Sequence, residues 1–197
     1  MSDILTPTTL SGPHARLEPL NASHCEGLQA ATRDGELWRL WYTAVPSAEG
    51  MAAEIERRLA LHAKGTMLPF TVFNAAGDIV GMTTFMNIDS ANRRVEIGST
   101  WYAASSQRSP LNTQCKLLLL GHAFEALNCI AIEFRTHRLN TASRRAIERL
   151  GAQLDGILRN HIRSPDGTLR DTAVYSITAD EWPVVKTHLQ WQLSKPR

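Results

Sequence analysis

Cysteine is scarce in this chain of 197 residues, and its scarcity excludes several classes of protein. The three cysteines, Cys25, Cys115 and Cys129, are odd in number, lie far apart and form no C-x-x-C pair. A disulfide framework or a zinc knuckle requires closer clusters. The seven histidines show neither an H-x-x-x-H nor an H-E-x-x-H pattern. The sequence therefore predicts free thiols and no bound metal.

Long apolar runs and an excess of one charge are also missing. Even the run Leu117–Leu120 is broken at once by Gly121 and His122, far short of the roughly 18 apolar residues that a membrane span requires. Lys+Arg 21 against Asp+Glu 19 gives a net charge of +2, too small and too evenly spread for a nucleic-acid protein. The N-terminus has no apolar segment typical of a signal peptide. We expect a cytoplasmic protein that binds neither membranes nor nucleic acid.

The hydrophobic patterns that are present predict one mixed α/β (α+β) domain over residues 1–197. The expected strands cover residues 15–20, 70–74, 79–85, 93–102, 129–137, 154–162 and 172–177. The expected helices cover residues 21–31, 47–62, 112–127, 140–150 and 179–193. Short turns join the three strands from 70 to 102 and the last two strands, so the central sheet is mostly antiparallel, with helices on both faces. The one parallel connection links strand 93–102 through helix 112–127 to strand 129–137.

A carboxylate stands in the middle of the strand that precedes this crossover. Strand periodicity places Glu96 on one face with Thr100, and Trp101 on the other face. A carboxylate between apolar neighbours is costly to bury unless it is paired or wet. Glu96 is therefore either one half of an ion pair with an arginine or a group that takes part in proton transfer.

Two helix starts near the crossover offer polar groups. The segment 107–113 joins a strand to a helix N-terminus, where backbone amides and the helix dipole favour an anion, and Arg108 adds a positive charge. The alternative is a plain loop with an Asn/Thr cap. Asn140 and Ser143 open the next helix; Asn140 either only caps that helix, or the pair serves a site.

In this order, the motifs resemble the GNAT (GCN5-related) N-acetyltransferase superfamily, in particular its RimJ/RimL-like branch of ribosomal-protein-alanine acetyltransferases. The resemblance covers nearly the whole chain. It is carried by His14-Ala15-Arg16-Leu17-Glu18-Pro19-Leu20, Glu96-Ile97-Gly98-x-Thr100-Trp101, Asn112-Thr113-x-x-Lys116-Leu117-Leu118-Leu119-Leu120, x-His122-Ala123-Phe124-Glu125, Asn140-x-x-Ser143-Arg144-x-Ala146-Ile147-Glu148-x-Leu150-Gly151-Ala152, Gly156-Ile157-Leu158-Arg159-x-His161, Asp166-Gly167-x-x-Arg170-Asp171-Thr172 and Glu181-Trp182-Pro183.

The resemblance implies the acyl-CoA N-acyltransferase fold and acetyl-CoA as co-substrate. In this superfamily the two parallel strands splay apart, the pantetheine arm lies between them, and the pyrophosphate rests on the loop before the central helix. The cofactor-binding residues implied here are Trp101, Tyr102, Ala103, Gln107, Arg108, Ser109, Leu111, Asn112, Thr113, Asn140 and Ser143. The family's loop glycines are replaced by Pro110 and Asn112. Because Pro110 has no N–H, at least one phosphate contact must come from another group.

The resemblance also implies direct attack of an amine on the thioester. Glu96 would accept the proton of the amine, directly or through water, and Ser143 would meet the departing thiolate. Many superfamily members carry a tyrosine on the helix of Ser143, which this chain lacks. Tyr175 on a late strand is either an alternative donor or a packed aromatic.

Trp38, Trp41 and Tyr42 lie between the first two helices, where this superfamily builds its acceptor pocket. They either receive the substrate or pack in the core. The acceptor is expected to be a primary amine of a protein N-terminus or a small molecule, and a homodimer is left open. Two alternatives to the N-acetyltransferase are a catalytically silent acyl-CoA-binding module and an interaction protein with no CoA site.

Overall fold

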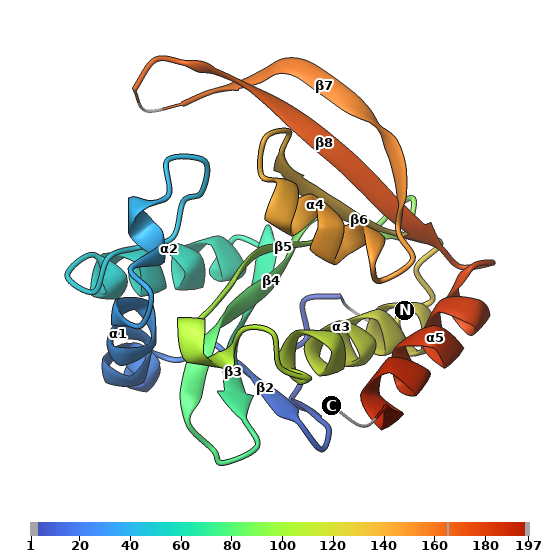
Figure 1. The fold of residues 1–197 in the computed structure, drawn as a ribbon, viewed down its shortest axis with the longest axis horizontal. Coiled ribbons are helices and arrows are strands. Elements are labelled where there is room, and N and C mark those ends of the chain that lie inside the picture. Colours follow the sequence, from blue (N-terminus) through green and yellow to red (C-terminus); the bar gives the residue numbers. More distant parts are fainter. Residues whose placement is uncertain (1–3, 165, 196–197) are drawn as a thin grey trace.

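The computed structural model describes residues 4–164 and 166–195 and shows one eight-stranded sheet with helices on both faces (Figure 1). Across the sheet the strands follow the order β1-β2-β3-β4-β5-β6-β8-β7. The strands are β1 Leu10–Ser11, β2 Ala15–Pro19, β3 Met67–Asn74, β4 Ile79–Asp89, β5 Arg94–Tyr102, β6 Ala131–His137, β7 Gln153–Arg163 and β8 Leu169–Thr178. All the pairs in this order are antiparallel except β5 with β6.

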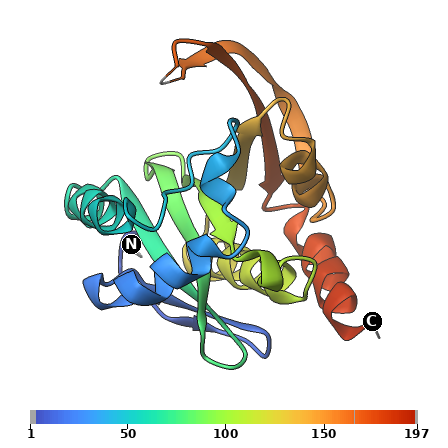
Figure 2. The same cartoon turned by 60° about the vertical axis from the view of Figure 1, so that its left-hand side comes forward.

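Two layers of helices cover the sheet. The helices are α1 Cys25–Arg33, α2 Met51–Ala63, α3 Leu111–Gly121, α4 Thr141–Glu148 and α5 Trp182–Ser194. On one face α1 and α2 pack through Leu28, Met51 and Ile55. On the other face α3 and α5 pack through a larger cluster that includes Leu119 and Leu189. Figure 2 shows the helices of the first face apart from those of the second, with the sheet between them.

The predicted order of helices and strands is confirmed from β2 onward, where the differences lie at the ends of elements. Helix α2 begins at Met51 because the amide of Gly50 donates to Ser47 Oγ (3.2 Å) and closes a turn ahead of the helix. Helix α5 begins at Trp182 because the amide of Thr178 donates to Glu181 Oε2 (2.8 Å). The long helix expected over 112–127 is α3 followed by a π-helical turn, His122–Ala126. The short strand β1 was not predicted.

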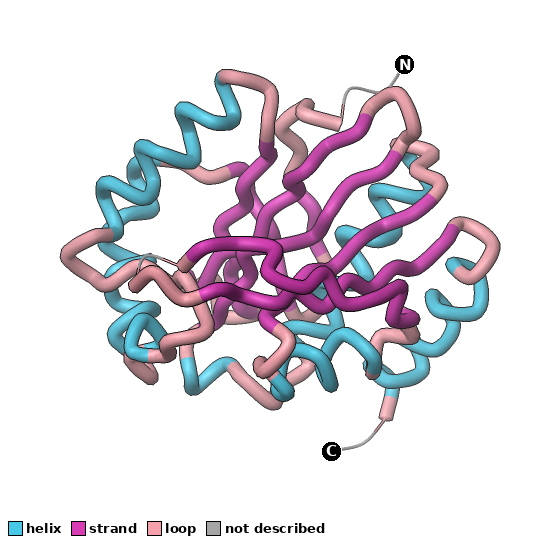
Figure 3. The backbone as a smooth tube through the Cα atoms, turned by 90° about the horizontal axis from the view of Figure 1, so that it is seen from above, coloured by secondary structure: helices cyan, strands magenta, loops and turns pink. Residues whose placement is uncertain are grey.

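The hairpin of β7 and β8 extends beyond the rest of the sheet (Figures 1 and 2), and seen from above it crosses in front of the other strands (Figure 3). Most residues of β7 are exposed, whereas the middle of β8 is buried against β6 and α4. No helix among the described residues has both the length and the apolar character needed to cross a membrane. The three cysteines are free thiols.

Candidate functional site

The two parallel strands separate part-way along their length. β5 and β6 pair only at Arg94–Ala131, Val95–Ile132 and Glu96–Glu133. Beyond these pairs β5 stays bonded to β4 and β6 stays bonded to β8. The hydrogen-bond ladder between them is therefore open from Glu96 and Glu133 to the ends of both strands. Because the strands are parallel, the segments that follow them lie at the same edge of the sheet as this opening.

A β-bulge at Ser99 changes which side chains face each layer. Ser99 has a φ of 48°, and the register with β4 skips a residue here, from Thr84↔Gly98 to Met82↔Trp101. The extra residue reverses the alternation of β5. The predicted faces are therefore wrong beyond the bulge. Trp101 packs in the cluster of α1 and α2, and Thr100 faces α3, where its hydroxyl accepts a hydrogen bond from Lys116.

Glu96 is buried beside the opening, with 5% of the residue exposed. Its Oε2 accepts a hydrogen bond from Asn87 Nδ2 at 2.6 Å, and Arg135 Nε lies 3.6 Å from the same oxygen. Burial raises the pKa of Glu96, because the Asn87 hydrogen bond and the charge of Arg135 offset the lost hydration only in part. Both alternatives for Glu96 thus find support: an arginine is present, yet the carboxylate keeps the raised pKa of a group suited to accept a proton.

The surroundings of Glu96 come from residues that the sequence analysis did not single out. Asn87 sits in a second bulge, with a φ of 47°, a conformation that asparagine tolerates better than most residues. Gly98 leaves the space that the carboxylate occupies, since a Cβ there would lie 2.6 Å from Glu96 Oε1. Arg135 lies two residues after Glu133, on the same face of β6. It also forms an ion pair with Glu133, with Nη2 2.8 Å from Oε2. The only hint in the sequence was the polar end of β4, Asn87-Ile88-Asp89, which indicates an irregular strand end but not a contact with Glu96.

The segment before α3 forms a compact turn. Ser109 Oγ donates to the carbonyl of Ser106 (2.6 Å) and accepts from the amide of Leu111 (3.2 Å). Gln107 Nε2 donates to the carbonyl of Tyr102 (3.0 Å), which ties the segment to the end of β5. Arg108 takes a left-handed φ of 56°.

Pro110 occupies a position where it does little harm. With φ −61° it already has helical geometry, and its carbonyl accepts the first helical hydrogen bond, from Gln114 (2.9 Å). The missing N–H of Pro110 belongs to the helix start, where amides lack helical partners in any case. The amides of Asn112 and Thr113 precede the first helical bond, so they lie at the end of α3 where the helix dipole favours an anion.

Asn140 and Ser143 lie at the end of the opening next to β6. Asn140 caps α4 by accepting a hydrogen bond from the amide of Ser143 (3.0 Å), so the capping role is present. The role of Ser143 toward a thiolate stays a prediction. Tyr175 is a packed aromatic: it is fully buried, and its hydroxyl donates to Glu148 and accepts from Arg144, both at 2.7 Å.

The predicted acceptor residues lie in the segment between α1 and α2. This segment is anchored near the end of β5, where the amide of Ser105 donates to Asp34 Oδ2 (3.0 Å). Trp41 is 69% exposed and makes edge contacts with Tyr42 and with His137 at the end of β6, at 5.5 and 5.1 Å between ring centres. The structure thus brings Trp41 and Tyr42 to β6 through His137, which the sequence analysis missed. Trp38 is half-buried in the 3-10 turn Leu37–Arg39.

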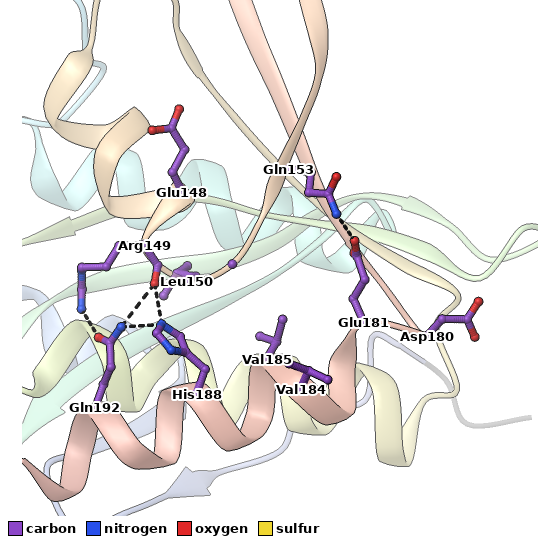
Figure 4. Close-up of a pocket in the computed structure, with 11 residues that line it drawn as sticks. Glu148, Arg149, Leu150, Gln153, Asp180, Glu181, Val184, Val185, His188 and Gln192 are labelled. Carbon is purple, nitrogen blue, oxygen red and sulfur yellow. Dashed lines mark hydrogen bonds between the residues drawn. The ribbon is translucent and has the colours of Figure 1, made fainter.

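A separate pocket lies away from these residues. It is an open hollow of about 800 Å³ between the end of α4, the start of β7 and α5 (Figure 4). Its polar side chains already bind one another: Gln153 donates to Glu181, and Arg149 and His188 bond to Gln192. None of the predicted catalytic, cofactor-binding or substrate-binding residues lines it. Within the described residues, no three His, Cys, Asp or Glu side chains gather as a metal site.

Comparison with known proteins assigns the fold to a class of transferases. A solved GCN5-related N-acetyltransferase from Brucella melitensis is 33% identical, with a TM-score of 0.83 over 95% of this chain and 86% of that one. RimJ of Mycobacterium smegmatis, solved with CoA-disulfide, shares the fold at 24% identity, with a TM-score of 0.79 over 95% of this chain and 96% of that one.

A family model described as an acetyltransferase (GNAT) domain matches residues 14–153. The chain belongs to the GNAT acetyltransferase family, as the resemblance implied. YdaF of Bacillus subtilis (strain 168), named as a ribosomal N-acetyltransferase, is 30% identical over 106 residues, which is 54% of this chain and 57% of YdaF. The chain thus spans a little over half the length of this curated relative. The match agrees with the RimJ/RimL-like branch.

Proposed function

We propose that this protein transfers an acetyl group from acetyl-CoA to a primary amine, on a protein N-terminus or a small molecule. The observation that carries the proposal is the buried Glu96 with a raised pKa at the point where the β5–β6 ladder opens. The amine of a substrate is an ammonium at neutral pH, so a nearby base must take its proton. Glu96 is that base.

The residues around the opening fit acetyl-CoA, which supplies the acetyl group as a reactive thioester. The unpaired edges of β5 and β6 offer backbone groups to the pantetheine arm, as an added strand would find them. The amides of Asn112 and Thr113 with Arg108 would hold the pyrophosphate. Ser143, at the start of α4, would donate to the leaving sulfur.

The acceptor would enter on the opposite side from α3. Glu96 shares the face of β5 that α1 and α2 cover, and Trp41, Tyr42 and His137 stand at the end of β6. We extend the proposal to the location of the enzyme, which we place in the cytoplasm, because this compartment holds both acetyl-CoA and ribosomal proteins.

The test is to measure thermal unfolding with acetyl-CoA and then thiol release with a panel of amines: short peptides with free N-termini, amino acids and polyamines. At about 100 times its Kd, acetyl-CoA adds roughly 2.7 kcal/mol to the unfolding free energy. Thiol release with at least one class of amine is expected. Stabilisation without thiol release for any of them would instead support the silent module, and no stabilisation at millimolar acetyl-CoA would reject both.

A further inference from the structure

Lys116 on α3 reaches the place where β5 and β6 separate. Only 6% of the residue is exposed. Its Nζ donates to Thr100 Oγ1 on β5 (3.1 Å) and lies 6.0 Å from the ring centre of Phe134 on β6. Both of these neighbours lie beyond the last paired residues of their strands, Glu96 and Glu133. The ammonium therefore stands between the two edges of the open ladder.

This buried ammonium is poorly satisfied by the protein. Among the described residues no carboxylate lies within 4 Å of it, and its hydrogen bond goes to a neutral hydroxyl. The neighbouring Cys115 and Tyr102 are themselves buried, which raises the pKa of both and keeps them uncharged. Burial lowers the pKa of Lys116 to about 8. A buried charge without a counter-charge destabilises the fold unless another partner completes its environment.

The Ser99 bulge makes this arrangement, because it turns Thr100 toward α3. Thr100 Oγ1 also lies 2.8 Å from Thr83 Oγ1, so the hydroxyl that orients the ammonium is itself held in place. An ammonium offers three donors, and Thr100 uses one of them.

We propose that Lys116 binds the acyl-pantetheine arm of acetyl-CoA by donating a hydrogen bond to one of its carbonyl oxygens. The inference rests on the proposed function, since it takes the arm to lie in the open ladder. The arm carries two amide carbonyls and the thioester carbonyl; CoA keeps the amides and lacks the thioester. Lys116 is then a binding residue inside the sheet, distinct from the amides of α3 that face the pyrophosphate.

The test is to compare the wild type with Lys116→Met by calorimetric titration with acetyl-CoA, CoA and adenosine 3′,5′-bisphosphate. We expect a loss of roughly tenfold or more in acetyl-CoA affinity, the range of a hydrogen bond to a charged group. Affinity for the bisphosphate stays unchanged, because it has no arm. An equal loss for CoA assigns the bond to an amide carbonyl, and a loss confined to acetyl-CoA assigns it to the thioester. The control is Lys186→Met, an exposed lysine paired with Glu125 on the far side of α3.

Stability separates this role from a structural one. Ligand-free Lys116→Met is expected to unfold at the same or a higher denaturant concentration than the wild type. Lys116→Gln, which keeps a neutral donor, is expected to show an intermediate affinity. A variant that binds acetyl-CoA as tightly as the wild type overturns the inference and leaves the proposed function intact. Equal losses for the bisphosphate, or a collapse of stability in both variants, overturn it as well. Failure of the wild type to bind acetyl-CoA instead overturns the proposed function.

Discussion

Two cations are buried on opposite faces of the sheet, and their surroundings differ. Arg58 on α2 is 2% exposed; its Nε donates to Glu54 Oε1 and its Nη1 to Thr84 Oγ1, both at 2.6 Å. Lys116 on α3 is almost as buried, but within residues 4–164 and 166–195 its partner is a hydroxyl and no carboxylate lies within 4 Å. The paired Arg58 joins α2 to β4 and explains its own burial. Lys116 has no such partner that would explain its burial. We therefore regard Arg58 as a structural charge and Lys116 as a charge that a ligand would complete.

The same contrast separates two carboxylates that lie side by side across β5 and β6. Burial acts to raise the pKa of Glu133, but hydrogen bonds from Arg94 and Arg135 outweigh it, and the pKa is lowered. For Glu96 burial prevails and the pKa is raised. The two paired residues therefore differ in character: Glu133 is a structural anion, and Glu96 is the candidate base.

The largest effect is expected from Glu96→Gln. Removing a general base lowers turnover by about 10²- to 10⁴-fold, whereas affinity for acetyl-CoA stays the same. Thiol-release kinetics and titration measure the two quantities. In the wild type, turnover falls as the pH falls through the raised pKa of Glu96, because protonation removes the base. Glu133→Gln is the matched control; an equal loss of turnover there would erase the contrast between the two carboxylates.

Arg58→Met is expected to lower the unfolding free energy by about 2 kcal/mol, because it removes the hydrogen bonds of Arg58 to Glu54 and Thr84, while Arg57 still pairs with Glu54. Urea denaturation measures the loss. Acetyl-CoA affinity of the folded variant should match the wild type. If this variant lost affinity and kept its stability, the roles assigned to Arg58 and Lys116 would be reversed.

The pH dependence of stability sharpens the same comparison. The pKa of Lys116 is about 8 in the folded protein against an ordinary value of 10.5. Between these values the unfolded chain holds a proton that the folded protein has released, so wild-type stability rises with pH. The advantage of Lys116→Met, present below pH 8, should shrink by roughly 2 kcal/mol by pH 10. Arg58→Met should show no comparable change in this window; a flat difference for Lys116→Met would contradict the burial of a charged lysine.

The smallest effect is expected from Gly98→Ala. The new Cβ would meet Glu96 Oε1 at 2.6 Å and Met86 Sδ at 2.8 Å, the ends of two flexible side chains. Stability should change by about 1 kcal/mol or less, while displacement of the carboxylate lowers turnover about tenfold. Gly156→Ala on β7 is the control, since nothing lies within 4 Å of its added Cβ. Unchanged turnover in Gly98→Ala would show that the position of Glu96 is not critical.

The sequence predicted the order of elements because strand alternation and helix signals are local. It also singled out Glu96, since a carboxylate among apolar strand residues stands out; the structure shows this side chain buried beside the opening, and its role as a base stays a prediction. The Ser99 bulge was missed, and with it the faces of Thr100 and Trp101, because Gly98-Ser99-Thr100 reads equally well as regular strand. Only the register with β4 reveals the extra residue.

Contacts between side chains from different strands could not be predicted from the sequence either. Asn87, Arg135 and His137 come to the site from β4 and β6, so their closeness depends on pairing between strands. Lys116 stands in a helix whose neighbours are apolar, and helical spacing alone does not tell a buried lysine from one whose chain reaches water. Element type is local information, whereas side-chain partnership is set by the register of the sheet.

The Ser99 bulge also divides β5 into two halves, in which the alternation of side chains between the two faces is reversed. Before it, alternate side chains such as Glu96 serve the layer of α1 and α2; after it, the side chain at the same even spacing, Thr100, serves α3. A single strand thus supplies a carboxylate to one layer and a hydroxyl to the other. Deleting one residue at this point would restore regular strand alternation. The side chains beyond the bulge would then face the opposite layers. In a set of related chains, a one-residue gap here would mark a change in which side chains face each layer, not a neutral change of length.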